Sequence, residues 1–363
     1  MFRSCYFIPY YAENAPIQFQ PSTEDGKGGM RGGSIGFVSG EGLTGADWLC
    51  VIDRPFANFY TDVPRERRIL LMTEPPDIRR YSLEYAEQYG VLVGPCPPEG
   101  YTGRVLVRNP ALGWWVGSSP AYAERFQRLD DFRTFRCEKT KAASLIVSLK
   151  RQCPGHRVRL AFLDALRERF GDEIDCFGRG FNPVEDKLEA IEPYKYHIVL
   201  ENSTVEHYWT EKLADAWIGW SLPIYFGDPG IRERIPDPEG IEIIDIRDVP
   251  SALRHIAEVL GRDDYAARLP AISRCREWAI RESSPYEAVC RIMECADDAA
   301  CFRPALAEPE PVYSPEGLVR LMIDREMERM VLEKRTRGIV TDANITLEIA
   351  WDGLSDDFYV TRI

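Results

Sequence analysis

The sequence predicts an α/β protein with two doubly wound domains and a C-terminal extension. With 363 residues, the chain exceeds the usual size of a single hydrophobic core. Strand and helix patterns alternate from residue 143 to residue 281, which is typical of a parallel sheet with helices on both faces. Before Pro120, short apolar runs alternate with turns and indicate a second α/β sheet. We place the first domain at 1–130, the second at 140–300 and the extension at 301–363.

The first domain is predicted from short apolar runs that end in turn residues. The run Arg68–Thr73 is the clearest, because its apolar centre is uninterrupted and two prolines follow it closely. Residues 26–36 are rich in glycine but lack the G-x-G-x-x-G spacing, so we expect a loop and not a nucleotide site. The expected strands are Ser34–Ser39, Trp48–Asp53, Arg68–Thr73, Val91–Gly94 and Val105–Val107.

The second domain and the tail show longer periodic segments. Apolar residues recur at helical spacing from Val158 to Phe170, and Thr210 is a suitable N-cap for a helix that ends before Pro223. The other expected helices are Val249–Leu260, Asp264–Arg281 and Pro315–Arg335. The expected strands are Ala143–Leu149, Ile174–Phe177, Tyr196–Leu200, Ile224–Phe226, Ile241–Ile246, Ile345–Ala350 and Phe358–Ile363.

The composition indicates a globular protein and argues against several classes of function. A net charge of −13 disfavours nucleic acids and anionic membrane surfaces as general partners. No apolar run approaches the length of a membrane span, and the first residues lack the pattern of a signal peptide. Ten cysteines without a C-x-x-C pair and four scattered histidines predict reduced thiols and no metal site. We expect a cytoplasmic protein, and leave peripheral association with the inner face of the membrane and a homo-oligomer open.

Polar residues follow the predicted strand Tyr196–Leu200, at the edge where parallel sheets bind their ligands. Glu201 and Asn202 come directly after the strand, and Glu211 and Lys212 lie in the first turn of the next helix. Unpaired N–H groups in a first helical turn attract anions, and a lysine beside them suits a phosphate or pyrophosphate. The residues alone are equally consistent with a solvated surface lysine.

A second group of basic residues lies near the start of the predicted helix Val158–Phe170. Lys150, Arg151, Arg157 and Arg159 cluster there. Positive charge at a helix amino terminus opposes the helix dipole, so we expect a bound anion to compensate it. The alternative is that these arginines lie on an exposed helix face.

A carboxylate ends the predicted strand Arg68–Thr73. Glu74 is followed by two prolines, which hold it in an extended conformation. A carboxylate in this place can act as a general base if burial raises its pKa. An ordinary loop glutamate is the alternative, and Glu66, Glu84 and Glu87 are the other candidates for the base.

The polar positions of the second domain form one long pattern. It comprises E-N-S at 201–203, Tyr208, T-E-K-L at 210–213, P-I-x-x-G at 223–227, C-F-G-R-G-F-N at 176–182 and D-P-G at 228–230. This pattern resembles the donor-site motif of the family 10 glycosyltransferases, the α-1,3/1,4-fucosyltransferases, in a bacterial-type form. The resemblance covers about residues 140–278 and is weak elsewhere.

The resemblance implies a GT-B-like architecture, with two Rossmann-like domains facing a cleft. It implies transfer of L-fucose, with inversion, from GDP-β-L-fucose to a hydroxyl of a glycan. Glu74 would be the general base, while Arg159, with Arg157 as the runner-up, and Lys212 would neutralise the departing diphosphate. The chain has no D-x-D pair, so we expect no metal ion or other cofactor in the site.

The remaining donor contacts are also implied by the resemblance. Glu211 would bind the ribose, and Asn202 and Tyr208 would position the phosphates and the sugar. Gly178 and Arg179 would form a tight turn close to the donor. These residues, together with Arg159 and Lys212, make up the expected donor site.

Two questions stay open from the sequence. Trp114 and Trp115 are candidates for stacking on an acceptor sugar, although tryptophans more often fill a core. Leu200, His207 and Trp209 depart from the family's pattern beside the donor pocket, so a different nucleotide-sugar donor is an alternative. A glycan- or nucleotide-binding module without turnover is the second alternative.

Overall fold

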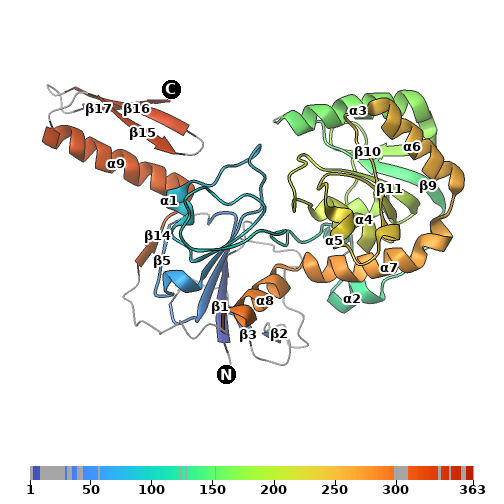
Figure 1. The fold of residues 1–363 in the computed structure, drawn as a ribbon, viewed down its shortest axis with the longest axis horizontal. Coiled ribbons are helices and arrows are strands. Elements are labelled where there is room, and N and C mark those ends of the chain that lie inside the picture. The colour runs from blue at the N-terminus through green and yellow to red at the C-terminus, as the bar shows by residue number, and fades with distance from the viewer. Residues whose placement is uncertain are drawn as a thin grey trace. The chain divides into compact units, whose positions relative to one another are not determined.

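A computed structural model of the chain describes residues 3–8, 29–30, 35–38, 44–55, 58–122, 124–127, 129–151, 153–297, 310–333, 337–342, 345–352 and 357–362. These residues divide into two compact units, each with its own parallel sheet (Figure 1). The first unit holds the described parts of 1–13, 35–106 and 299–363, and the second those of 14–34 and 107–298. The predicted α/β fold class is therefore confirmed.

The first unit is built on parallel strands in the order β3-β1-β4-β6-β7-β8. Their bounds are β1 Arg3–Ile8, β3 Ile35–Val38, β4 Trp48–Ile52, β6 Arg68–Leu71, β7 Val91–Val93 and β8 Arg104–Leu106. Every residue of β4, β6 and β7 is buried, as expected for central strands of a parallel sheet covered on both faces. The short helix α1 (Leu83–Ala86) and the tyrosines at 81, 85 and 89 pack on this core.

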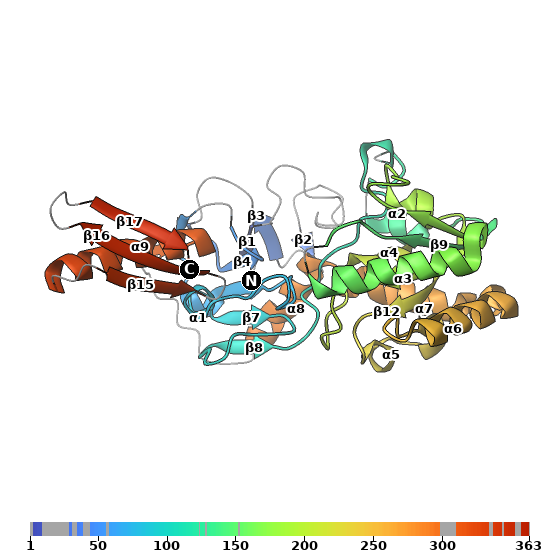
Figure 2. The same ribbon diagram turned by 90° about the horizontal axis from the view of Figure 1, so that it is seen from above.

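The C-terminal part of the chain also belongs to the first unit. Strand β14 (Glu310–Val312) pairs with β5 (Phe59–Thr61) in antiparallel fashion. Helix α9 (Pro315–Glu333) then lies along a small antiparallel sheet, as Figure 2 shows. That sheet consists of β15 (Arg337–Asp342), β16 (Ile345–Asp352) and β17 (Asp357–Arg362), and its core against α9 contains Met330, Val340 and Ile349.

The second unit is a parallel sheet in the order β10-β9-β11-β12-β13, flanked by helices. Figure 1 shows this sheet between α3 and α6 on one side and α7 on the other. The strands are β9 Lys141–Ile146, β10 Ile174–Phe177, β11 Tyr194–Leu200, β12 Leu222–Phe226 and β13 Glu242–Ile243. The helices are α2 Leu129–Thr134, α3 Pro154–Phe170, α4 Glu211–Ile218, α5 Ile231–Arg234, α6 Val249–Arg262, α7 Tyr265–Glu282 and α8 Pro285–Asp297, and a further short strand is β2 Gly29–Met30.

The division into units differs from the predicted boundaries. The segment from Val107 onward belongs to the second unit, because Trp114, Phe126 and Phe132 are buried in its core. The expected extension at 301–363 joins the first unit through the β14–β5 pair. Across the described ranges, no helix combines the length and the apolar character that a membrane crossing requires.

Several elements also differ from their predicted bounds. Helix α3 begins at Pro154, four residues before Val158, and is capped by Cys153. Five strands, β1, β2, β5, β14 and β15, were not predicted from the sequence, and β13 is shorter than the expected Ile241–Ile246. Most of the glycine-rich segment 26–36 lies outside the described residues.

Candidate functional site

A buried carboxylate joins the end of β11 to the start of α4. Glu201 is fully buried, and its carboxylate accepts hydrogen bonds from the Thr210 backbone N at 2.7 Å and the Thr210 hydroxyl at 2.8 Å. The Lys212 Nζ lies 3.2 Å from the same carboxylate. Thr210 also caps α4, as predicted, because its hydroxyl accepts from the Lys212 backbone N. The first turn of α4 is thus fixed at the carboxyl edge of the sheet.

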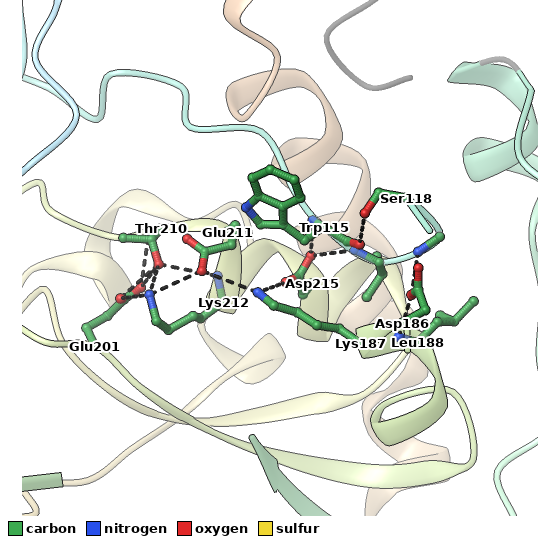
Figure 3. Close-up of polar contacts among 12 residues, drawn as sticks. Trp115, Ser118, Asp186, Lys187, Leu188, Glu201, Thr210, Glu211, Lys212 and Asp215 are labelled. Carbon is green, nitrogen blue, oxygen red and sulfur yellow. Dashed lines mark hydrogen bonds and ion pairs between the residues drawn. The ribbon is translucent and has the colours of Figure 1, made fainter. Parts of the chain in front are cut away.

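Side chains of alternating charge form a row, the charge line, that runs through Glu201, Lys212, Glu211, Lys187 and Asp215. Glu211 Oε1 lies 3.3 Å from Lys212 Nζ and 3.3 Å from Lys187 Nζ, and Lys187 Nζ lies 2.7 Å from Asp215 Oδ2 (Figure 3). Burial alone would raise the pKa of Glu211, but the charges of Lys212 and Lys187 outweigh it and hold that pKa well below its ordinary value. Glu211 therefore stays ionised at neutral pH.

Lys187 is the central cation of this line. Its ammonium stays protonated because Asp215 and Glu211 outweigh the effect of burial and raise its pKa. Burial raises the pKa of Asp215, which is 1% exposed, although Lys187 opposes that shift. Removing Lys187 would leave the buried Asp215 without a counter-charge, whereas Glu211 would keep Lys212.

Two aspartates, Asp186 and Asp215, accept hydrogen bonds from the backbone of the loop at 115–119 and hold it beside the charge line. Asp215 Oδ1 accepts from the backbone N of Trp115 at 2.6 Å and of Val116 at 3.0 Å. Asp186 accepts from the backbone N of Gly117 at 2.8 Å and of Ser119 at 2.9 Å (Figure 3). The loop therefore belongs to the second unit, and its backbone is anchored through the charge line.

Arg159 converges on the end of β11 from α3. It is 4% exposed, and its Nη1 donates to the Leu200 carbonyl at 3.0 Å. Its Nε has no hydrogen-bond partner among the described residues. Burial lowers the pKa of Arg159 against the opposing charges of Glu201 and Glu211, and the Arg159 charge in turn acts on Lys212. Arg159 and Lys212 thus lie at one edge of one sheet, as the sequence predicted.

The expectation that Arg159 lies at the amino terminus of a helix was wrong. Because α3 begins at Pro154, Arg159 lies in its second turn and not at the amino terminus. Its guanidinium is directed to the end of β11 by burial and by the Leu200 carbonyl. Arg157, the runner-up, is exposed.

The amino terminus of α3 packs closely on the residue after Glu201. A Cβ at Gly155 would lie 1.9 Å from the Asn202 carbonyl oxygen, so only glycine allows this approach. Next to it, the backbone N of Cys153 donates to His156 Nδ1 at 3.3 Å. Burial and the charges of Arg159, Lys150 and Lys212 lower the pKa of His156 to about 4. The imidazole is therefore neutral at pH 7 in a strongly positive environment.

The other predicted donor residues lie at or near the same edge. The Tyr208 hydroxyl donates to Asn202 Oδ1 at 3.1 Å, and Tyr208 is buried. Gly178 follows β10 in a turn, where its N donates to the Asn182 carbonyl at 2.8 Å. A Cβ at Gly178 would lie 1.7 Å from the Val147 carbonyl oxygen, which explains the glycine. Arg179 is exposed in that turn.

Glu74 lies in the first unit, at the carboxyl end of β6. The backbone N of Thr73 donates to the Tyr81 hydroxyl at 3.0 Å, and the Glu74 backbone N does so at 3.4 Å. The Glu74 charge contributes to raising the pKa of Arg79. Glu74 follows strand β6, as the sequence predicted. Its role as a general base stays a prediction.

The alternative bases have other surroundings. Glu66 is exposed in a turn before β6, at the opposite end of that strand. Glu87 pairs with Arg65 and accepts from the Thr102 backbone N at 2.7 Å, and hydrogen bonds from Thr102 and the Arg65 charge outweigh burial and lower its pKa. Glu84 is exposed in the first turn of α1.

The paired tryptophans differ in their surroundings. Trp114 is fully buried, and its ring packs edge-on against Phe132 with centroids 5.3 Å apart. It fills the core of the second unit, so the expectation that it stacks on an acceptor sugar is corrected. Trp115 is partly exposed beside the charge line, and its acceptor role stays a prediction.

Sequence reasoning did not include Lys187, Asp186 or Asp215 in the site. Asp215 had a detectable pattern, because it interrupts the apolar face of α4 one turn after Glu211. A charged residue on a buried helix face needs a counter-charge. Nothing in the sequence identifies Lys187 as that partner, since it comes from a different element.

Two α/β units, each with a parallel sheet, give the chain a GT-B-like fold. Residues 137–267 match the family model for "Glycosyltransferase family 10 (fucosyltransferase) C-term". The matched part of the chain includes α3, β11 and α4 and is similar to that family.

Individual relatives agree with the family model. The chain is 30% identical over 139 residues to a fucosyltransferase-like protein of Arabidopsis thaliana and 29% identical over 108 residues to an α-(1,3)-fucosyltransferase of Helicobacter pylori. These matches span 38% and 28% of this chain, but only 25% and 22% of the relatives' own lengths. A crystal structure of an α1,3-fucosyltransferase with GDP-fucose has a TM-score of 0.50 at 14% identity, over 83% of this chain and 92% of that one, and shares the fold.

Proposed function

We propose that the protein transfers L-fucose, with inversion, from GDP-β-L-fucose to a hydroxyl of a glycan, with an α-1,3-type linkage. The observation that carries this proposal is the convergence of Arg159 and Lys212 at the carboxyl edge of the second sheet. Support also comes from the family model and from an α1,3-fucosyltransferase of the same fold that was crystallised with GDP-fucose.

The electrostatics of that edge suit a diphosphate. Burial, together with the charges of Arg159, Lys150 and Lys212, lowers the pKa of His156 to about 4, so its ring is neutral at pH 7. The buried Nε of Arg159 has no hydrogen-bond partner among the described residues. Fixed cations at a site of developing negative charge stabilise a transition state without reorganisation.

The reaction assigns one role to each group. A bond forms between the acceptor oxygen and the anomeric carbon of fucose, and the bond from that carbon to the β-phosphate oxygen breaks. Glu74 takes the proton from the acceptor hydroxyl. GDP leaves with the bonding electrons, and Arg159 and Lys212 neutralise its charge. Glu211, fixed between Lys187 and Lys212, accepts from the ribose hydroxyls.

A panel of donors tests the assignment. GDP-fucose, GDP-mannose and UDP-sugars are each mixed with the purified protein, lactose and N-acetyllactosamine, and transfer is followed by mass spectrometry. We expect transfer of fucose from GDP-fucose. Stabilisation by a UDP-sugar but not by GDP would show a different donor. Binding of GDP-fucose without transfer or hydrolysis would favour a binding module without turnover.

Variants of the two cations test the site itself. Lys212→Ala removes a charge-assisted contact worth about 1.5–3 kcal/mol, so we expect GDP binding to weaken roughly 10- to 150-fold in isothermal titration. Arg159→Ala should weaken binding similarly. Arg157→Ala is the matched control, because Arg157 is exposed on the same helix, and it should bind GDP as the wild type does.

Glu74→Ala separates binding from chemistry. The variant should bind GDP normally and lose transfer by a factor of 100 or more, because a general base contributes roughly that much to the rate. Normal transfer by this variant would show that the base lies elsewhere, and Glu84→Ala would be tested next.

A further inference from the structure

The first unit contains a pocket of about 430 Å³ that the proposed donor site does not use. This volume is within the usual range for small-molecule sites. One wall comes from the segment that follows β6, and the other comes from the C-terminal module α9–β15–β16. The lining residues that carry the argument are Arg79, Arg80, Tyr81, Val319, Asp342 and Ile345.

The pocket lies at the ligand-binding edge of the first sheet. Residues 53 and 54 follow the buried strand β4, and residues 72–82 follow β6. Ligands of parallel α/β sheets bind beyond the carboxyl ends of the strands. The C-terminal module adds the opposite wall, where α9 begins beside α1 (Figures 1 and 2).

The wall after β6 is held in one conformation by a buried network. Asp53 accepts from the Tyr81 hydroxyl at 2.6 Å and forms an ion pair with Arg79. The Tyr85 hydroxyl donates to the Asp53 carbonyl at 3.0 Å. Asp53 has a φ of +61°, a conformation that non-glycine residues rarely adopt and that often marks a functional site. The pocket wall is thus preorganised.

The same network reaches Glu74. The Tyr81 hydroxyl that contacts Asp53 also accepts from the backbone N of Thr73 and Glu74. A single segment therefore carries Glu74 at one end and the pocket wall at the other. Arg79, which lines the pocket, also experiences the charge of Glu74, to which we assign the acceptor proton.

The charges of the lining identify the chemistry of the ligand. Arg54 forms an ion pair with Glu316, and Arg79 forms one with the buried Asp53, so their positive charges are compensated. Arg80 and Asp342 add one charge of each sign. The pocket therefore lacks the net positive charge that a phosphate or a carboxylate would need.

The same lining suits a sugar. Guanidinium groups donate hydrogen bonds, and carboxylates accept them, as the hydroxyls of a saccharide require. Ile78, Pro315, Val319 and Ile345 offer apolar surface to its C–H groups. We propose that this pocket binds a neutral saccharide and is the subsite that holds the acceptor glycan. Only the second half of this proposal rests on the proposed function.

Saccharide binding is tested without any donor. Saturation-transfer NMR is recorded on the full-length protein with galactose, lactose and N-acetyllactosamine, and with glucuronic acid as the acidic comparison. We expect transfer to at least one neutral sugar in the wild type. We expect its loss in Val319→Trp, which fills the pocket, and a weaker effect in Asp342→Ala, which removes an acceptor. Val360→Trp, on the exposed strand β17, is the matched control and should bind as the wild type does.

Three outcomes would overturn the proposal. They are the absence of saturation transfer to every neutral sugar, equal transfer in Val319→Trp and wild type, and transfer to glucuronic acid alone. In a transfer assay, Val319→Trp should raise the KM for the acceptor tenfold or more and leave the KM for GDP-fucose unchanged. If GDP-fucose proves not to be the donor, the NMR result still shows whether the pocket binds a neutral saccharide. The two proposals can therefore fail separately.

Discussion

At the scale of single residues, Lys187 fixes the charged side chains at the carboxyl edge of the second sheet. This lysine is not part of the sequence pattern that resembles a donor-site motif. Lys187 lies between Glu211 and Asp215, and it therefore fixes the carboxylate to which we assign the ribose contact. Asp215 in turn holds the backbone of the loop at 115–119. One lysine thus connects the helix α4 to a loop that is distant in the sequence.

Replacing Lys187 by methionine should destabilise the protein strongly. The change keeps the approximate length of the side chain but leaves the buried Asp215 without its cation and Glu211 with Lys212 alone, and breaking a buried pair in this way costs about 3 kcal/mol. The free energy of unfolding in urea measures it. Lys141→Met is the matched control, because the Lys141–Asp175 pair is exposed and should contribute less than about 1 kcal/mol. Equal losses in the two variants would contradict the role of Lys187.

At the scale of elements, local patterns predicted the end of β11 and the start of α4 well. The strand at 196–200 and the Thr210 cap were both correct, because each depends on neighbouring residues alone. The start of α3 was placed too late, since Cys153 is not one of the usual capping residues and Pro154-Gly155 looks like a loop. The ion pairs of Lys187 could not be predicted, because they join residues that only the fold brings together.

Gly155 is predicted to be essential for the junction of α3 and β11. Gly155→Ala would place a methyl group 1.9 Å from the Asn202 carbonyl oxygen, where backbone must move to accept it. We expect lower stability and weaker GDP binding, because Arg159 would shift with the helix. Gly261→Ala in α6 is the control: a Cβ there meets nothing within 4 Å, and alanine should stabilise the helix by about 0.5–1 kcal/mol. Thermal melting and GDP titration of both variants distinguish these effects.

At the scale of the whole molecule, the sequence predicted the fold class but divided the chain at the wrong places. Composition and strand–helix alternation indicate two α/β domains, and these are local properties. The allocation of the tail depends on the β14–β5 pair, which joins residues about 250 positions apart in the chain. Apolar residues at 107–136 are equally suitable for either core, and only the structure shows that they pack in the second.

Acid stability is a property of the whole molecule to which two histidines with lowered pKa values, His156 and His197, should contribute. The His197 Nδ1 lies 2.8 Å from the Ser144 hydroxyl, and burial, with the charges of Lys187 and Lys139, lowers the pKa of His197 to about 3. The unfolded chain binds this proton below about pH 6.5, whereas the folded protein does not until about pH 3. The stability that His197 contributes is therefore fully present above pH 6.5 and falls as the pH drops, by about 1.4 kcal/mol per pH unit between pH 6 and pH 5.

Urea unfolding at pH 7, 6 and 5 measures this slope. In His197→Asn, which keeps a polar group near Ser144 but cannot titrate, the slope should fall by the same amount, although stability at pH 7 will be lower. Below about pH 4.5 the lowered pKa of Glu211 adds a further loss of stability, so the comparison belongs above that value. An unchanged slope in His197→Asn would show that other groups control the acid stability of the fold.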